Sequence, residues 1–137
     1  MSVLELALRV VGVSHIALAL AHVGIWRAFD WTREIARLSP LTARVFAVHT
    51  FFVAFVLAAL GALLAFRADL VTTSSDFARL VLGFGVAFWC LRLLAQPLVF
   101  DPVFLVDKPR LRTPLRAAAL LGFAAYVGVY AWALAQQ

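Results

Sequence analysis

The sequence predicts an all-α integral membrane protein, an up-down four-helix bundle with a short interfacial helix between helices one and two. Hydrophobic residues make up 65% of the 137 residues and charged residues 14%, against about 45–50% and about 25% in soluble domains. The mean hydropathy is +0.99. Four apolar runs approach the roughly 20 residues that a spanning helix needs, and short connections favour antiparallel neighbours.

This composition excludes a soluble globular enzyme and a disordered chain, because 14% charge cannot cover the surface of so small a domain. The net charge of +5 is spread over loops rather than gathered in a stripe with aromatic residues, so no nucleic-acid partner is expected. Cys90 is the only cysteine and lies in an apolar run, which excludes an internal disulfide.

The predicted spans belong to a single transmembrane domain covering residues 1–137. They are residues 10–26, 46–66, 77–100 and 117–135. The first span is expected to be a retained helix and not a cleaved signal peptide, because Glu5 and Arg9 precede it without a net-basic start.

Capping residues mark the expected helix starts. Ser39 before Pro40, and Thr113 before Pro114, each place a hydroxyl ahead of a proline at the first helical position. Residues 74–76 (Ser-Ser-Asp) offer a cap for the third span. Small residues are expected at helix contacts in the third and fourth spans; these are Gly83, Gly85, Ala118, Gly122, Ala124 and Gly128.

Residues 30–38 predict the short interfacial helix. Its apolar and charged side chains separate onto opposite faces, as in helices that lie in a membrane interface. The apolar face holds Trp31, Ile35 and Leu38, and the charged face holds Arg33, Glu34 and Arg37.

Basic residues predict the orientation, since cytoplasmic loops carry the excess of arginine and lysine. Eight lie in the first and third connections, three lie on the other side, and one lies within a span. Both termini are therefore expected on the outer face of a bacterial inner membrane, with Tyr130 and Trp132 anchoring the outer interface. Arginine outnumbers lysine eleven to one, a bias that suggests a GC-rich bacterial genome.

Ionisable residues deep within the spans are costly and tend to mark function, and a glutamine lies near one of them. The ionisable residues are His15, His22, His49 and Arg92, and the glutamine is Gln96. His22 and His49 lie about 5–6 Å inside the expected cytoplasmic boundary at 1.5 Å per residue, and Gln96 lies at a similar depth. If these faces converge, the inner half of the bundle holds a polar pocket, with Trp89 at its apolar end.

Arg92 is the most informative of these residues because no acidic residue lies within a span to neutralise it. Helical side chains lean toward the helix N-terminus, which here points away from the nearer boundary. The guanidinium is therefore expected to turn inward toward Gln96, carbonyls, a buried water or an anionic head group. Pro97 removes the hydrogen bond to the Leu93 carbonyl and is expected to kink the helix. Asp101 reaches Arg92 only if that kink folds it back.

Three segments together resemble small bacterial four-helix membrane proteins to which no activity is assigned. They are residues 31–40 (WTREIARLSP), 44–49 (RVFAVH) and 88–92 (FWCLR), followed by Gln96 and Asp101. The resemblance implies a four-helix inner-membrane fold and brings no catalytic role.

The sequence favours a non-catalytic binding or accessory protein, because no catalytic motif is present. Its expected site residues are His22, His49, Trp89, Arg92 and Gln96, and its expected ligand is the head of a lipid or quinone, or a partner helix. No cofactor is predicted. The bilayer is a partner, and a homo-oligomer or a larger membrane complex is a further interpretation.

Three alternatives stay open. The histidines form only packing hydrogen bonds between helices. A haem b or metal ion binds between His22 and His49, with His15 serving an outer site. The chain is a small oligomeric transporter in which Pro97 acts as a hinge.

Overall fold

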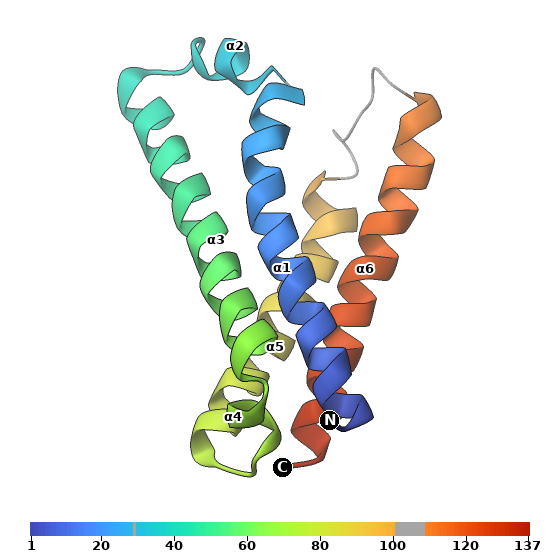
Figure 1. Cartoon of the computed structure of the whole chain (residues 1–137). Coiled ribbons are helices and arrows are strands. Elements are labelled where there is room, and N and C mark those ends of the chain that lie inside the picture. Colours follow the sequence, from blue (N-terminus) through green and yellow to red (C-terminus); the bar gives the residue numbers. More distant parts are fainter. Residues whose placement is uncertain (29, 101–108) are drawn as a thin grey trace. The chain divides into compact units, whose positions relative to one another are not determined.

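The computed structural model describes residues 1–28, 30–100 and 109–137, and these ranges contain six α-helices, one π-helical turn and no strand. Four of the helices are long and apolar enough to cross a membrane, which confirms the all-α four-helix class (Figure 1). They are α1 (Val3–Ala28), α3 (Pro40–Arg67), α5 (Asp76–Ala95), which continues into the π turn η1 (Gln96–Phe100), and α6 (Pro109–Ala135).

The helices extend beyond the predicted spans because capping and loop residues, not hydrophobicity, set helix ends. Ser39 caps α3 as predicted, its side chain accepting a hydrogen bond from the Thr42 amide at 3.2 Å. The predicted start at Pro114 is wrong, since α6 begins at Pro109. A proline so close to a helix start removes only one intrahelical hydrogen bond, so the helix continues through it.

Contacts group the chain into two compact units. The first holds residues 6–68 together with Met1, and the second holds residues 2–5 and 69–137. Most of α1, the short α2 (Trp31–Ile35) and α3 belong to the first unit. The one-turn α4 (Asp69–Thr72), α5, η1 and α6 belong to the second. The single transmembrane domain stays a prediction.

In the first unit, α1 and α3 meet backbone to backbone at two glycines. A Cβ atom on Gly12 would collide with the main chain of residues 61–65, including the Gly61 carbonyl oxygen at 2.7 Å. A Cβ on Gly61 would lie 2.8 Å from the Gly12 carbonyl oxygen. Arg9 reinforces this contact by donating from Nη1 to the Ala65 carbonyl oxygen at 2.8 Å. From here the two helices diverge toward α2 (Figure 1).

The short helix α2 confirms the predicted helical connection, although it is shorter than residues 30–38. Asp30 precedes it in the left-handed region with φ of 50°, a conformation that aspartate tolerates better than most residues. Trp31 packs edge-on against Trp26 and Phe46, with ring centroids 5.8 and 5.2 Å away. This aromatic cluster joins α2 to the diverging ends of α1 and α3.

In the second unit, α5 packs against α6 through a glycine and large aromatic side chains. Ser75 caps α5 by accepting from the Ala78 amide at 3.1 Å. The Tyr130 ring lies where a Cβ on Gly85 would be. Tyr130 is fully buried and does not present its ring at the protein surface, as an interface anchor would. Trp89 is also buried and packs on Tyr126, with ring centroids 4.3 Å apart.

The predicted small-residue contacts hold only for Gly85 among the glycines. A Cβ on Gly83, Gly122 or Gly128 would meet nothing within 4 Å. The contact between Gly12 and Gly61 was not predicted.

Substituting Gly12 with alanine tests this contact. We expect Gly12→Ala to lower the free energy of unfolding by about 1–3 kcal/mol, because a methyl group there displaces backbone and not a flexible side chain. Gly83→Ala is the matched control, and we expect it to be neutral or stabilising by up to about 1 kcal/mol through helix propensity. Reversible unfolding in detergent micelles measures both, and equal effects of the two variants would contradict the close contact.

Candidate functional site

The C-terminal end of α5 widens into a π turn at the proline. Pro97 carries no N–H and cannot bond to the Leu93 carbonyl, and the chain follows the wider turn η1 over Gln96–Phe100. The predicted kink therefore takes the form of a π turn. Such turns change the register of the side chains that follow them and are frequent at functional sites.

Arg92 extends toward this turn and not toward the start of α5. Its Nη1 donates a hydrogen bond to Gln96 Oε1 at 3.1 Å, as expected. Its Cζ lies over two aromatic rings, those of Phe100 and Phe123, at 4.5 Å from each ring centroid. Within the residues described, Arg92 does not bond to the Leu93 carbonyl.

The two rings and the amide offset much of the cost of placing a guanidinium in a span. Each cation–π contact contributes about 0.5–1 kcal/mol at an exposed site and about 2 kcal/mol when desolvated. A hydrogen bond to a charged group adds about 1.5–3 kcal/mol. Among residues 1–28, 30–100 and 109–137, no carboxylate forms an ion pair with Arg92. Asp101 lies outside the described residues.

The guanidinium of Arg92 has more N–H donors than the one that Gln96 accepts. The five N–H groups of a guanidinium lie in its plane, and Arg92 is half-buried and not enclosed. The Phe100 and Phe123 rings contact it through Cζ, and Gln96, which is 2% exposed, accepts from one N–H. The remaining donors suit a phosphate or carboxylate oxygen, which arginine binds in a planar, two-pronged geometry.

Trp89 supports this site from within the helix pair. Its indole stacks on Phe123 with ring centroids 5.5 Å apart, and Phe123 in turn lies under the guanidinium. Phe123 therefore couples the packing of α5 against α6 to the position of Arg92. Sequence reasoning missed Phe123 because it lies on another helix, α6. It missed Phe100 because eight residues of regular helix would separate it from Arg92 by about 12 Å along the axis.

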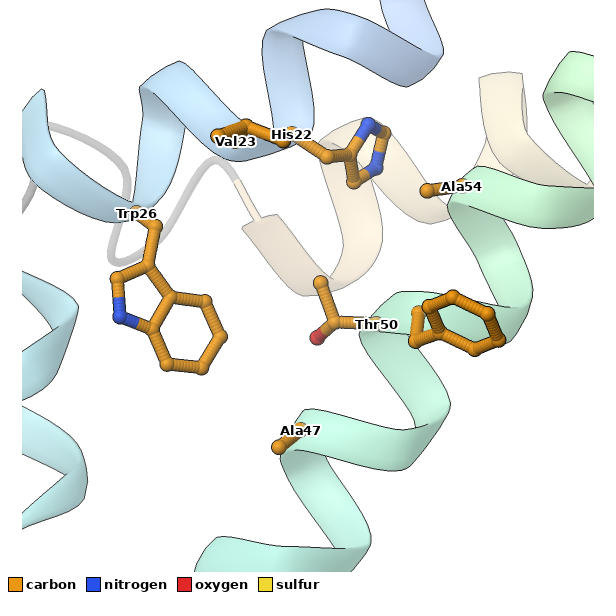
Figure 2. Close-up of a pocket in the computed structure, with 7 residues that line it drawn as sticks. His22, Val23, Trp26, Ala47, Thr50 and Ala54 are labelled. Atoms are coloured by element: carbon orange, nitrogen blue, oxygen red, sulfur yellow. The ribbon is translucent and has the colours of Figure 1, made fainter.

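His22 lies in the first unit, on the wall of a groove between α1 and α3. Its Nδ1 donates to the Leu18 carbonyl oxygen at 2.8 Å. The groove encloses about 380 Å³. Figure 2 shows the side chains of His22 and Trp26 from α1 on one side of it, and Thr50 and Ala54 from α3 on the other. Val23, Ala47 and Phe51 complete its lining.

The other two histidines do not join His22. His49 is exposed and does not line the groove, because about 100–160° of helix rotation separates it from Ala47, Thr50 and Phe51. His15 is fully buried at the Gly12–Gly61 contact, with its Cβ 3.0 Å from a Cβ placed on Gly61. Within the described ranges no three potential ligands gather around a metal position. The haem or metal alternative stays a prediction.

The predicted site residues thus form two groups, each within its own unit. Trp89, Arg92 and Gln96 come together in the second unit, whereas His22 lines the groove of the first. No family model, curated protein or solved structure matches the chain. The resemblance to small bacterial membrane proteins stays an expectation, and the chemistry of each site rests on its own contacts.

A double-mutant cycle tests the contact between Arg92 and Phe123. We expect Phe123→Leu and Arg92→Met to show a coupling free energy of about 0.5–2 kcal/mol, because either change alone removes the cation–π contact. The free energies of unfolding of the four proteins in bicelles give the coupling. Phe84, an exposed phenylalanine on α5, provides the matched control cycle. Additive effects of the Phe123 and Arg92 changes would contradict the contact.

Proposed function

We propose that the chain is a non-catalytic, multi-pass bacterial inner-membrane protein that binds the anionic head group of a membrane amphiphile at Arg92. The observation that carries this proposal is a half-buried guanidinium that contacts the Phe100 and Phe123 rings and donates one hydrogen bond to Gln96. A phosphate-bearing lipid supplies the acceptor oxygens that the remaining edge donors need.

The position of the site favours an amphiphile over a soluble anion. Arg92 lies within the apolar stretch Asp76–Phe100, which is long enough to cross a membrane, and large apolar side chains nearby, including Leu91 and Leu94, are exposed. Acyl chains would cover these side chains while the head group meets the guanidinium. The second candidate for this site is the acidic side chain of a partner helix, which would give the chain an accessory role. The lipid-binding experiment distinguishes the two.

The charge distribution supports placing this site in the cytoplasmic leaflet. Eight of the twelve basic residues flank the first and third connections, so the positive-inside rule puts these connections in the cytoplasm and both termini outside. The C-terminal end of α5 then lies near the cytoplasmic surface, where anionic lipids give a negative potential.

Lipid binding tests the proposed function. We expect the purified full chain to bind phosphatidylglycerol at least about tenfold more tightly than phosphatidylcholine with the same acyl chains, because only the former carries net negative charge. Arg92→Gln should remove this preference, and Arg92→Lys should retain only part of it because an ammonium lacks the planar fork. Native mass spectrometry with lipid titration measures the binding.

Arg110→Gln is the matched control, since it removes the same charge from an exposed arginine at the start of α6. An unchanged preference in Arg92→Gln, or an equal loss in Arg110→Gln, would contradict the Arg92 site. If the wild-type chain shows no lipid preference but retains a co-purified protein that Arg92→Gln loses, the result would favour a partner helix at this site.

Cysteine labelling tests the proposed orientation. In a Cys90→Ser background, we expect a membrane-impermeant maleimide to label Gln136→Cys in intact spheroplasts. It should label Ala36→Cys only after the membrane is opened, because the first connection is placed in the cytoplasm by its basic residues. Both positions are exposed. The reverse labelling pattern would contradict the orientation and would move the Arg92 site to the outer leaflet.

A further inference from the structure

The groove between α1 and α3 has an unusual distribution of hydrogen-bonding groups. Three polar side chains line it, and each commits its proton to the protein. His22 donates from Nδ1 to the Leu18 carbonyl oxygen at 2.8 Å, and Thr50 donates to the Phe46 carbonyl oxygen at 2.9 Å. Trp26 donates from Nε1 to Thr32 Oγ1 at 3.2 Å.

Two acceptors remain once these donors are used. A neutral imidazole that carries its proton on Nδ1 presents Nε2 as an acceptor. The hydroxyl of Thr50 donates its single proton to Phe46 and keeps oxygen lone pairs. In Figure 2 the His22 ring and the Thr50 side chain belong to opposite walls of the groove. The groove therefore offers acceptors, and its lining side chains have no uncommitted donor.

The walls of the groove are apolar and partly aromatic. Trp26 and Phe51 supply ring surfaces, and Val23, Ala47 and Ala54 supply small aliphatic ones. The volume of about 380 Å³ lies within the range of small-molecule sites, about 300–1,000 Å³. The groove lies between the backbone contact of α1 and α3 at Gly12 and Gly61 and the Trp26–Trp31–Phe46 cluster, where aromatic side chains bridge the diverging helices.

We infer that this groove binds a neutral, membrane-soluble molecule that carries a hydroxyl group on an aromatic ring, a phenol or a hydroquinone. The ring packs between the aromatic and aliphatic walls, and its hydroxyl donates to His22 Nε2 or Thr50 Oγ1. An anion is disfavoured because acceptors line the groove, and a quinone is disfavoured because its carbonyl oxygens only accept. This site is independent of the one at Arg92 and belongs to the other unit.

A pair of probes in which a methyl group replaces the hydroxyl proton tests this inference. We expect the full chain, in phosphatidylcholine bicelles, to bind para-octylphenol about tenfold more tightly than the methyl ether of para-octylphenol, the effect of about one hydrogen bond. Isothermal titration with empty-bicelle blanks measures both affinities. The ratio of the two affinities, compared between protein variants, cancels the partitioning of each probe into the bilayer.

Substitutions assign the acceptors. His22→Phe and Thr50→Val should each lower the affinity ratio, because each removes one of the two acceptors, and Thr50→Val does so while keeping the shape of the side chain. His49→Phe is the matched control, since His49 is exposed and lies on another face of α3, and it should leave the ratio at about ten. Circular dichroism and size exclusion confirm that each variant is folded, and Thr50→Val carries the test if His22→Phe is not.

Three results would overturn the inference. The first is no binding of octylphenol above the blank. The second is equal binding of octylphenol and its methyl ether by the wild-type chain. The third is an equal change of the ratio in His49→Phe and in the folded groove variant. Arg92→Gln should not change the ratio, so failure of this inference and failure of the anionic site at Arg92 are distinguishable.

Discussion

A guanidinium within a membrane span must find polar or π-electron partners inside the protein, and the second unit is organised around this requirement at Arg92. Two aromatic rings and one amide oxygen supply the partners. Phe100 supplies one ring from the π turn that contains Pro97. Phe123 supplies the other ring from α6, where it stacks on Trp89 of α5. The charge is stabilised without a carboxylate in the described part of the chain, and the proposed anionic ligand would supply the missing countercharge.

The first unit follows a different constraint, the close approach of two backbones at Gly12 and Gly61. The helices α1 and α3 touch at these glycines and diverge toward the Trp26–Trp31–Phe46 cluster, and the groove lies between these two contacts. Its chemistry is opposite to that of Arg92. Where the second unit presents donors and positive charge, the groove presents acceptors in an apolar setting, so the two sites are suited to different classes of ligand.

Hydrophobicity and capping residues predicted the four long helices and the cap at Ser39, because these signals are local in sequence. The contact between Arg92 and Gln96 was predictable for the same reason, since residues four apart meet on one helix. The contact between Arg92 and Phe123 was not predictable, because packing against α5 sets the rotation of α6 about its axis. His49 was assigned to a pocket from its depth alone, although helical periodicity turns it away from Thr50. Depth in the spans predicts that polar residues of both units line one pocket, and this stays a prediction.

Nitrogen-15 NMR of the arginine side chains in bicelles tests most directly whether the Arg92 guanidinium contacts the Phe100 and Phe123 rings and still binds an anion. A guanidinium over two ring faces should show side-chain proton resonances shifted upfield by ring currents, and Arg92→Lys identifies them by their disappearance. Adding phosphatidylglycerol should shift these resonances further, whereas phosphatidylcholine should not. Resonances at the positions of solvent-exposed arginines, unchanged by either lipid, would contradict the account.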